Sequence, residues 1–249
     1  MSEVVRTEEL GVATLTLNRP EKLNALTTTM FTQLRAHLQD IGNDRSIRCV
    51  VLEGRGRAFC AGRDFLSVRG PRTSSEGTFE AETIDVLEAQ PQPTICKVHG
   101  HCYAGGFELV LACDFIIASR SAIFSDTHAT LGLTPIWGMT VRLIEHVGQS
   151  RAREIMFTGR TVSGDEAARI GIANRCVEDD DLDNVVTEIA QSIVAVSPDA
   201  VRLNKLVMSE QLGLSREDAL LFERRRPFGF ANDREERLRQ ATKPSIPPT

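Results

Sequence analysis

The chain has 249 residues, of which 41% are hydrophobic and 25% are charged, and its formal net charge is −5. This length is sufficient for one large α/β domain, or for a core with a small helical appendage. The acidic balance argues against a nucleic-acid partner, because a dedicated nucleic-acid binder presents a basic surface. No membrane partner is expected either, since the N-terminus has no apolar signal and the most apolar stretch, residues 109–118, is short and interrupted by Asp114.

The cysteines indicate a reducing compartment. The sequence has no CxxC pair, and most of its cysteines lie inside apolar segments, so we expect buried free thiols and a cytoplasmic location. The six residues concerned are Cys49, Cys60, Cys96, Cys102, Cys113 and Cys176.

Strand and helix signals alternate through the first part of the chain. Residues 12–17 alternate in polarity and are rich in β-branched side chains, which predicts a strand. Thr27 is expected to cap a helix whose buried face carries apolar side chains at helical spacing. Further strands are expected at 49–52, 94–98 and 115–118, helices at about 79–89 and 105–113, and a surface loop at 69–78. This order predicts an α/β fold with parallel strands.

The pattern changes in the last quarter of the chain. Ser163 and Glu166 have the spacing of a capping box, and the helix that they begin is expected to end at Gly171. From Leu182 onwards the apolar residues keep helical spacing, Pro198 begins a new helix, and the end at 244–249 is irregular. We therefore divide the chain into a core, residues 1–190, and a C-terminal helical region, residues 191–249.

Two glycine-bearing turns carry the chemical interest of the sequence, after other motifs fail. Gly54-Arg-Gly56 lacks the third glycine of a dinucleotide fingerprint, and the ligands in 99–102 lack a distant fourth, so no metal site is expected. The remaining turns, 54–64 and 98–114, each follow an apolar strand. Free backbone N–H groups at such turns can stabilise an oxygen that becomes negative, although such turns also serve purely structural purposes.

Three segments of the chain match, in the same order, the motifs of one protein family. They are Asn18-Arg-Pro-Glu-Lys-Leu-Asn-Ala-Leu26, Gly56-Arg-Ala-Phe-Cys-Ala-Gly-Arg-Asp64, and the stretch from Gly100 to Asp114 with its Glu-Leu-x-Leu-x-Cys-Asp ending. Over about residues 10–178 the chain resembles the enoyl-CoA hydratase/isomerase (crotonase) family, and more weakly in the tail. The resemblance implies a crotonase-like spiral of ββα units. It also implies that the C-terminal α-helical region is a trimerisation region, giving a homotrimer or a dimer of trimers.

The same resemblance implies the ligand and part of the site. The family binds acyl-CoA thioesters without a separate cofactor, because coenzyme A enters as part of the substrate. Its oxyanion hole is made by two backbone N–H groups, which fall here on Arg63 and Gly105; Arg63 departs from the small residue common among hydratases. The residues matching substrate- or CoA-binding positions are Lys22, Asn24, Ala25, Ala61, Arg63, Asp64, Phe65 and Trp137. Trp137 either shapes the acyl pocket or belongs to the core.

The catalytic acid–base residues match the family only in part. Glu108 falls on the first catalytic glutamate, although a glutamate in the first turn of a helix also complements the helix dipole. The second catalytic glutamate is missing, and His128 occupies its register. His128 can transfer protons near neutral pH or line the pocket without catalysis. Asp126, two residues earlier, can orient His128 or replace it.

These features favour a hydratase that reversibly adds water to a 2-enoyl-CoA through an enolate stabilised by the oxyanion hole. One alternative is a double-bond isomerase, which needs only one base. Hydrolase or decarboxylase activity, and a non-catalytic acyl-CoA-binding trimer, stay open as well, because a fold does not choose its reaction. In the tail, the run Arg224–Arg226 is expected to be a solvated or intersubunit helix face, with binding of a CoA phosphate as the alternative.

Overall fold

The computed structural model describes residues 2–64 and 78–242, and its centre is a sheet of six strands. The antiparallel pair β1 and β2 is followed by strands that all run parallel to β2. In spatial order the strands are β1 (Val4–Glu9), β2 (Val12–Leu17), β3 (Cys49–Gly54), β4 (Thr94–Val98), β6 (Phe115–Ser119) and β9 (Arg175–Val177). The predicted strands at 12–17, 49–52, 94–98 and 115–118 all lie in this sheet.

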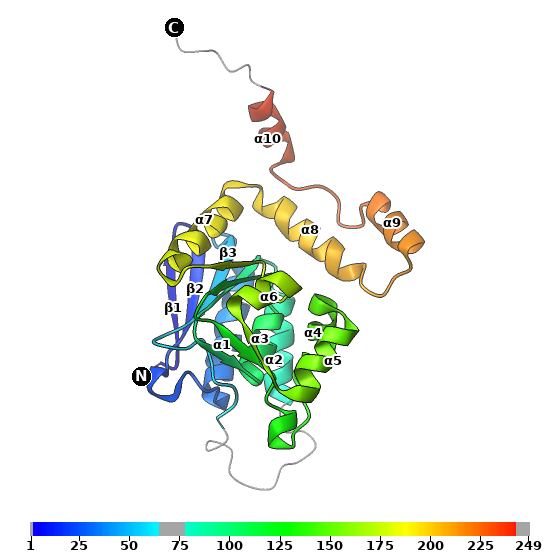
Figure 1. The fold of residues 1–249 in the computed structure, drawn as a ribbon. Helices are drawn as coiled ribbons and strands as arrows, with labels where there is room; N and C mark the ends of the chain where they lie inside the picture. The colour runs from blue at the N-terminus through cyan, green and yellow to red at the C-terminus, as the bar shows by residue number, and fades with distance from the viewer. Residues whose placement is uncertain (1, 65–77, 243–249) are drawn as a thin grey trace.

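A second sheet of three short strands lies beside the first. Its strands, in spatial order, are β5 (His101–Tyr103), β7 (Ile123–Ser125) and β8 (Thr161–Ser163). The chain twice passes from the large sheet to the small sheet and then into a helix. The first passage is β4, β5 and α3 (Gly105–Leu111), and the second is β6, β7 and, after a loop, α4 (Met139–Val147). This is the repeated ββα turn of the expected spiral (Figure 1). Strands of three residues are too short to give an alternation signal, and the sequence did not predict them.

Helices cover both faces of the large sheet (Figure 1). The main core packs α1 (Thr28–Asn43), α2 (Thr78–Glu88), α3, α4 and α5 (Gln149–Thr158) with one face, and α7 (Leu182–Ala195) covers the other. Thr27 caps α1 as predicted, since its side chain accepts a hydrogen bond from Met30 N at 3.0 Å. The predicted face of α1 is buried in the core: Phe31, Leu34, Leu38 and Ile41.

The capping box at Ser163 is only half formed. The Ser163 hydroxyl accepts from Glu166 N at 3.2 Å, but the Glu166 carboxylate binds the Arg160 guanidinium at 2.9 and 3.1 Å instead of returning to the cap. The helix α6 (Gly164–Ile170) ends at Gly171, whose φ of +96° suits glycine. Single helical turns occur at η1 (Pro20–Lys22), η2 (Ala129–Leu131) and η3 (Asp179–Asp181). The predicted loop at 69–78, except Thr78, and the irregular end at 244–249 lie outside the described residues.

The C-terminal helices leave the core progressively. Helix α7 packs on the sheet through Leu182, Val186 and Ala190 and continues past residue 190, so the division that we placed there stays a prediction. Helix α8 (Pro198–Glu210) is tied to the core by polar contacts, including Lys205 Nζ to Asp114 Oδ2 at 2.6 Å. Helices α9 (Arg216–Arg225) and α10 (Arg234–Ala241) project away from the core (Figure 1).

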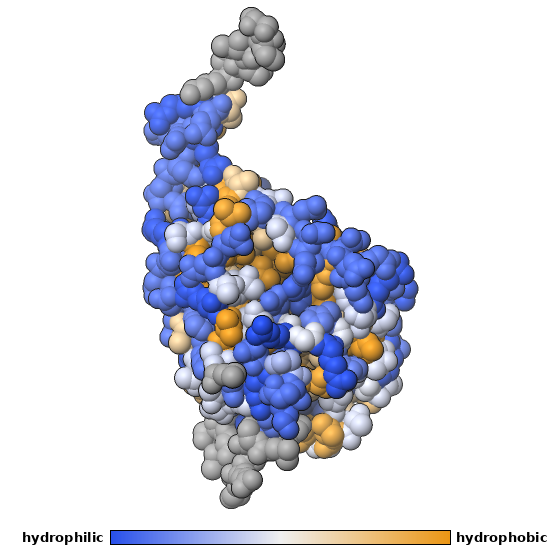
Figure 2. All heavy atoms as spheres, turned by 90° about the vertical axis from the view of Figure 1, so that its left-hand side faces the viewer, coloured by the Kyte–Doolittle hydropathy of each residue, from blue (hydrophilic) through white to orange (hydrophobic). Residues whose placement is uncertain are grey.

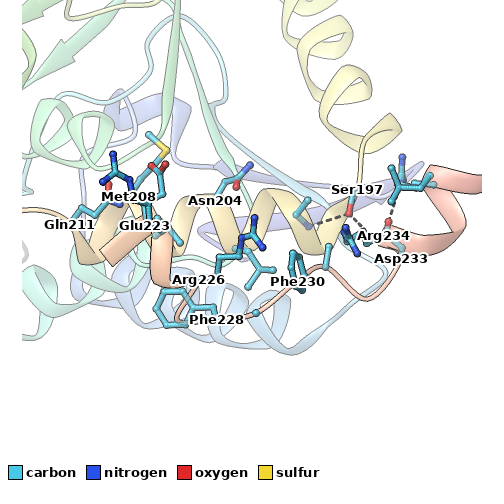
Figure 3. Close-up of a pocket in the computed structure, with 18 of the residues that line it drawn as sticks. Ser197, Asn204, Met208, Gln211, Glu223, Arg226, Phe228, Phe230, Asp233 and Arg234 are labelled. Carbon is cyan, nitrogen blue, oxygen red and sulfur yellow. Dashed lines mark hydrogen bonds and ion pairs between the residues drawn. The ribbon is translucent and has the colours of Figure 1, made fainter. Parts of the chain in front are cut away.

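A groove of about 1010 Å³ separates α8 from the segment 226–238. Figure 3 shows Phe228, Phe230 and Met208 facing it together with charged side chains such as Arg226 and Arg234. Hydrophilic side chains cover most of the face drawn in Figure 2, whereas hydrophobic side chains are exposed where the C-terminal helices leave the core. Within residues 2–64 and 78–242, no helix has the length and apolar character that crossing a membrane requires.

Candidate active site

The two glycine-bearing turns meet at the edge of the small sheet. Cys60 N donates to His101 O at 2.9 Å, and Tyr103 N donates to Cys60 O at 3.0 Å. The turns approach so closely that a Cβ on Gly62 would lie 3.0 Å from Tyr103 O, and Gly62 has a φ of +96°. Glycine is therefore required at this position. The ideal Cβ position of Gly62 is 3.5 Å from Gly105 N, so the predicted oxyanion turns are neighbours.

Each turn offers one backbone N–H group without a partner among the described residues. The backbone of Leu26 forms hydrogen bonds with both neighbours of Arg63. Leu26 N donates to Gly62 O at 2.8 Å, and Asp64 N donates to Leu26 O at 2.9 Å. The N–H of Arg63, between them, has no partner among the described residues. Gly105 begins α3, so its N–H has no acceptor inside the helix. Ala104 before it has φ +45° and ψ −116°, a strained conformation that costs about 1–3 kcal/mol and sets the direction of this N–H.

Glu108 lies one turn into α3 and is buried, with 1% of its surface exposed. Its Oε1 accepts two hydrogen bonds, from Trp137 N at 2.9 Å and from Met139 N at 3.2 Å. Its Oε2 lies 3.7 Å from His128 Nε2, which is longer than a hydrogen bond. One oxygen of the carboxylate is thus fixed by the backbone, and the other is left for chemistry.

His128 and Asp126 form a hydrogen-bonded pair beside Glu108. Asp126 Oδ1 contacts His128 Nδ1 at 2.5 Å and also accepts from the backbone N–H of His128 at 3.1 Å. A carboxylate on Nδ1 holds the proton on that nitrogen and turns Nε2 toward Glu108. Of the two roles considered for Asp126, the geometry therefore favours orienting His128 over replacing it.

The surroundings raise the affinity of both acid–base groups for a proton. Burial raises the pKa of Glu108, and this outweighs the opposing effects of His128 and of the two backbone hydrogen bonds. Burial alone would lower the pKa of His128, but the hydrogen bond that His128 donates to Asp126 and the charge of Glu108 raise it above its ordinary value. Both groups therefore bind a proton more tightly than the same side chains do in water.

A cavity of about 260 Å³ joins these groups. Its wall includes Arg63 and Gly105, the predicted oxyanion residues, and Glu108 and His128, the predicted acid–base residues. Trp137 closes one side: its Cζ3 would be 2.4 Å from a Cβ on Gly105, and its ring meets Phe31 edge to face at 5.0 Å. Trp137 is thus both a buried packing residue and a wall of the cavity, which combines the two roles considered from the sequence.

Arg142 supports the Trp137 side of the cavity, and the sequence did not single this residue out. Arg142 is 7% exposed; its Nη1 donates to Trp137 O at 2.7 Å, and its other nitrogens bind Glu88 and Asp85. It thereby fixes the backbone that donates to Glu108. Gly138 has a φ of +110°, and its Cβ position is 2.0 Å from Arg142 Nη1. No sequence signal marks Arg142, because its carboxylate partners lie more than 50 residues away in the chain.

The other described residues matched to substrate binding are not among those that line the cavity. Asn24 is fully buried, and its amide donates to Arg55 O and Ala58 O at 2.9 Å, so its side chain holds the first turn in place. Asp64 pairs with Arg19 at 3.0 Å. The remaining matches belong to the same loops: Ala25 and Ala61 are half-buried, Lys22 is exposed, and Phe65 lies outside the described residues.

Comparison with known proteins agrees with this geometry. The family model described as enoyl-CoA hydratase/isomerase matches residues 7–237. The short-chain-enoyl-CoA hydratase of Clostridium acetobutylicum is 35% identical, over 90% of this chain and 87% of its own length. The crotonyl-CoA hydratase of Syntrophomonas wolfei is 30% identical, over 88% and 86%. The crystal structure of enoyl-CoA hydratase from Bacillus anthracis superposes with a TM-score of 0.91 at 32% identity, covering 96% of this chain and 95% of that one.

Repeated ββα turns, and a cavity lined by a buried carboxyl and by two residues whose N–H groups lack a partner in the described part of the chain, define the class of protein. The chain belongs to the enoyl-CoA hydratase/isomerase family. The fold and family predicted from the three sequence segments are both confirmed.

Proposed function

We propose that the protein is an enoyl-CoA hydratase, which reversibly adds water to the double bond of a 2-enoyl-CoA. One observation carries the proposal: Glu108 Oε2 and His128 Nε2 face each other at 3.7 Å in a cavity that also holds Arg63 and Gly105. Two proton-transferring groups suit hydration, in which one proton is removed from water and another is added to carbon. The relatives named as hydratases support the same reaction.

The free N–H groups of Arg63 and Gly105 bind the thioester oxygen in this mechanism. When water attacks C3, the electrons of the double bond move through C2 onto this oxygen, and an enolate forms. Two fixed donors stabilise that negative charge more than the neutral carbonyl, which lowers the barrier. Since the backbone of residue 63 donates, its arginine side chain does not prevent this function.

Glu108 and His128 share one mobile proton, and the reactive form has ionised Glu108 and protonated His128. Glu108 Oε2 accepts a proton from the attacking water as the C3–O bond forms. His128 Nε2 then donates its proton to C2, and the electrons of the enolate form the C2–H bond. Transfer of the proton from Glu108 to His128 restores the starting state, so one water is consumed and no other reactant is needed. The mechanism therefore uses no separate cofactor.

The coenzyme A portion extends, in this proposal, along the outside of the same loops, where Lys22 is exposed and Ala25, Ala61 and Asp64 are half-buried. We also propose a cytoplasmic location, because five of the six unpaired cysteines are buried as thiols.

We further propose that the C-terminal region forms the contacts of a homotrimer or of a dimer of trimers. Phe230 is 55% exposed, Met208 69% and Leu238 50%, and all three line the groove beside α8. Clustered apolar side chains of this kind are typical of surfaces that another subunit covers.

Incubation of the purified protein with 2-enoyl-CoA and 3-enoyl-CoA thioesters, followed by mass analysis of the products, tests the reaction. A gain of one water from the 2-enoyl substrate is the expected result. Conversion of 3-enoyl-CoA to an isomer of equal mass, without hydration, would identify an isomerase instead. Binding without turnover of either substrate would identify a scaffold. A His128→Gln variant should hydrate much more slowly, since an amide cannot exchange protons.

A further inference from the structure

Cys60 lies where the two glycine-bearing turns meet, and it is fully buried. Its backbone pairs with the strand β5, which leads into the second turn. Cys60 N donates to His101 O at 2.9 Å, and Tyr103 N donates to Cys60 O at 3.0 Å. Cys60 therefore belongs to the first turn and is bonded to the strand that leads into the second.

The thiol of Cys60 binds the backbone of the first turn at two points. Its Sγ donates to Asn24 O at 3.2 Å and accepts from Gly62 N at 3.3 Å. Burial raises the pKa of Cys60 to about 12, so at neutral pH the sulfur keeps the proton that it donates. The thiol thus acts as donor and acceptor at once, as a hydroxyl would. Gly62, which it binds, directly precedes Arg63, one of the two proposed oxyanion residues.

The same side chain also packs against the second turn. A Cβ on Gly106 would lie 2.7 Å from Cys60 Cβ, and 2.9 Å from both Cys60 Sγ and Cys60 O. The backbone of α3 therefore rests directly on Cys60, with no space for a side chain at residue 106. Gly106 directly follows Gly105, the other proposed oxyanion residue. Cys60 thus contacts a chain neighbour of each proposed donor.

Two N–H groups stabilise one oxygen only if both reach it, at about 2.7–3.1 Å from the position that the oxyanion occupies. Their spacing must then be fixed by residues that contact both turns. We propose that Cys60 is a positioning residue, whose side chain fixes the spacing between the N–H groups of Arg63 and Gly105. It is not among the described residues that line the cavity, so it acts through the two turns. The inference rests on the proposed function, because it takes these N–H groups as the donors to the thioester oxygen.

Kinetics with but-2-enoyl-CoA test the role of the thiol. Cys60→Ala removes the sulfur and keeps the backbone bonds to β5. We expect kcat to fall by about tenfold or more while KM changes less than about threefold, because misplaced donors weaken the transition state more than the ground state. Cys60→Ser keeps a donor and an acceptor and should recover most of the loss. Wild-type kcat in folded Cys60→Ala, or no recovery in Cys60→Ser, would overturn the proposal.

Cys49→Ala is the matched control. It removes the sulfur of another fully buried cysteine, which packs in the cluster beneath α7 on the other face of the sheet. It should lower the melting temperature about as much as Cys60→Ala does, since each substitution leaves a small cavity in the core. It should leave kcat at the wild-type value. The same loss of kcat in both variants would show that Cys60 serves the core and not the spacing of the turns.

Binding of butanoyl-CoA tests the spacing without turnover, because this saturated thioester has no double bond to hydrate. Infrared difference spectroscopy, with an isotope label at the carbonyl carbon, measures the stretching frequency of the bound thioester. Donation from N–H groups lowers this frequency. We expect the full lowering in wild type and Cys49→Ala, and less than about half of it in Cys60→Ala, since hydrogen bonds weaken steeply away from their best geometry. No lowering in wild type, or full lowering in Cys60→Ala, would overturn the proposal.

Gly106→Ala tests the same contact from α3. Alanine suits a helix better than glycine does, so the helix itself gains from the change. The new Cβ meets Cys60 and moves the turns apart, so kcat and the infrared lowering should both decrease. Should Cys60→Ala fail to fold, as judged by circular dichroism, this variant decides the question. Wild-type values of both quantities in folded Gly106→Ala would overturn the proposal.

The two proposals fail in different ways. If wild type lowers the carbonyl frequency but hydrates no 2-enoyl-CoA, the hydratase function is wrong, and the infrared comparison of Cys60→Ala with Cys49→Ala decides the role of Cys60. If hydration occurs and folded Cys60→Ala matches wild type in both measurements, the role of Cys60 is wrong and the hydratase function stands.

Discussion

The cavity around Glu108 and the groove beside α8 differ in the side chains that they expose to solvent. Around the cavity, Glu108 and Asp126 are each 1% exposed, and both carboxylates are bound by groups of the same chain. Along the groove, Phe228 is 37% exposed and Phe230 55%, and arginines of the C-terminal segment lie over the Phe230 ring. In one region carboxylates are buried and paired, and in the other apolar side chains are exposed to water.

This difference shows which part of the molecule a single chain can complete. Burying a carboxylate without partners is costly, so the cavity folds only when the backbone and side chains that bind Glu108 are in place. Exposure of aromatic rings to water also costs free energy, and this cost is removed when another surface covers the rings. Changes near the cavity should therefore alter chemistry or folding, and changes in the groove should alter association.

The largest effect is expected from Glu108→Gln. The amide keeps an oxygen for the N–H groups of Trp137 and Met139 but cannot transfer the proton, so turnover should fall by about 10²- to 10⁴-fold. Because the pKa of Glu108 is raised in the folded protein, its ionisation disfavours folding as pH rises through and above the ordinary value. The variant should therefore melt at or above the wild-type temperature at pH 7.

Kinetics with a 2-enoyl-CoA and thermal unfolding measure both quantities. Glu178→Gln is the control, because Glu178 forms an exposed ion pair with Arg120 and should keep wild-type turnover. Wild-type turnover in Glu108→Gln would exclude Glu108 as the acid–base group.

Arg142→Met should destabilise the fold. The substitution leaves Trp137 O without its donor and removes the support of the loop that binds Glu108, at a cost of about 1–3 kcal/mol in the free energy of unfolding. The loss in the free energy of unfolding should not exceed about 3 kcal/mol, because the carboxylates of Asp85 and Glu88 are exposed and become hydrated when the guanidinium is removed. Denaturant unfolding should show this loss, whereas Arg120→Met, at an exposed pair, should change stability by less than about 0.5 kcal/mol. Equal effects of the two substitutions would contradict the proposed support.

Phe230→Ser sharpens the contrast from the groove side. If a partner subunit covers the ring, the dissociation constant of the assembly should rise by about tenfold or more, since burial of a large apolar side chain is lost. The free energy of unfolding of the separated subunit should change little. Analytical ultracentrifugation measures the association. Phe157→Ser removes a phenylalanine that is 75% exposed on α5, outside the groove lining, and should leave association unchanged. The same shift in both variants would disprove the role of the groove.

The smallest effect is expected in the pH profile of Asp126→Asn. In the proposed mechanism the site is active while Glu108 and His128 share one proton, so turnover should fall at low pH when a second proton binds and at high pH when the shared proton is lost. The hydrogen bond and charge of Asp126 raise the pKa of His128. Their removal should move the high-pH limb to lower pH by about one unit.

The rate of hydration between pH 5 and 10 measures this limb. Asp183→Asn, on an exposed residue of α7, should leave the profile unchanged. If the high-pH limb of Asp126→Asn stays at the wild-type pH or moves to higher pH, Asp126 does not raise the pKa of His128.

Several elements could be predicted from the sequence because their signals are local. The buried face of α1 repeats at helical spacing, and the predicted strands of the large sheet are apolar runs bounded by turns, so neighbouring residues suffice to identify them. The two glycine-bearing turns could be located because their glycines and the strands before them are contiguous. The strands β5, β7 and β8 were missed, because three residues give no periodicity.

By itself the sequence determined the family and the alternation of helices with the strands of the large sheet, and it predicted Glu108 and His128 as the acid–base residues. Each of these is recorded in residues close together in the chain. The tertiary structure decided that Asp126 binds His128, that Trp137 and Met139 hold one oxygen of Glu108, and that Arg142 holds Trp137. Glu108 and Trp137 are 29 residues apart, and Arg142 and Glu88 are 54 apart. Such contacts depend on how separate elements pack, and neither local spacing nor composition records that packing.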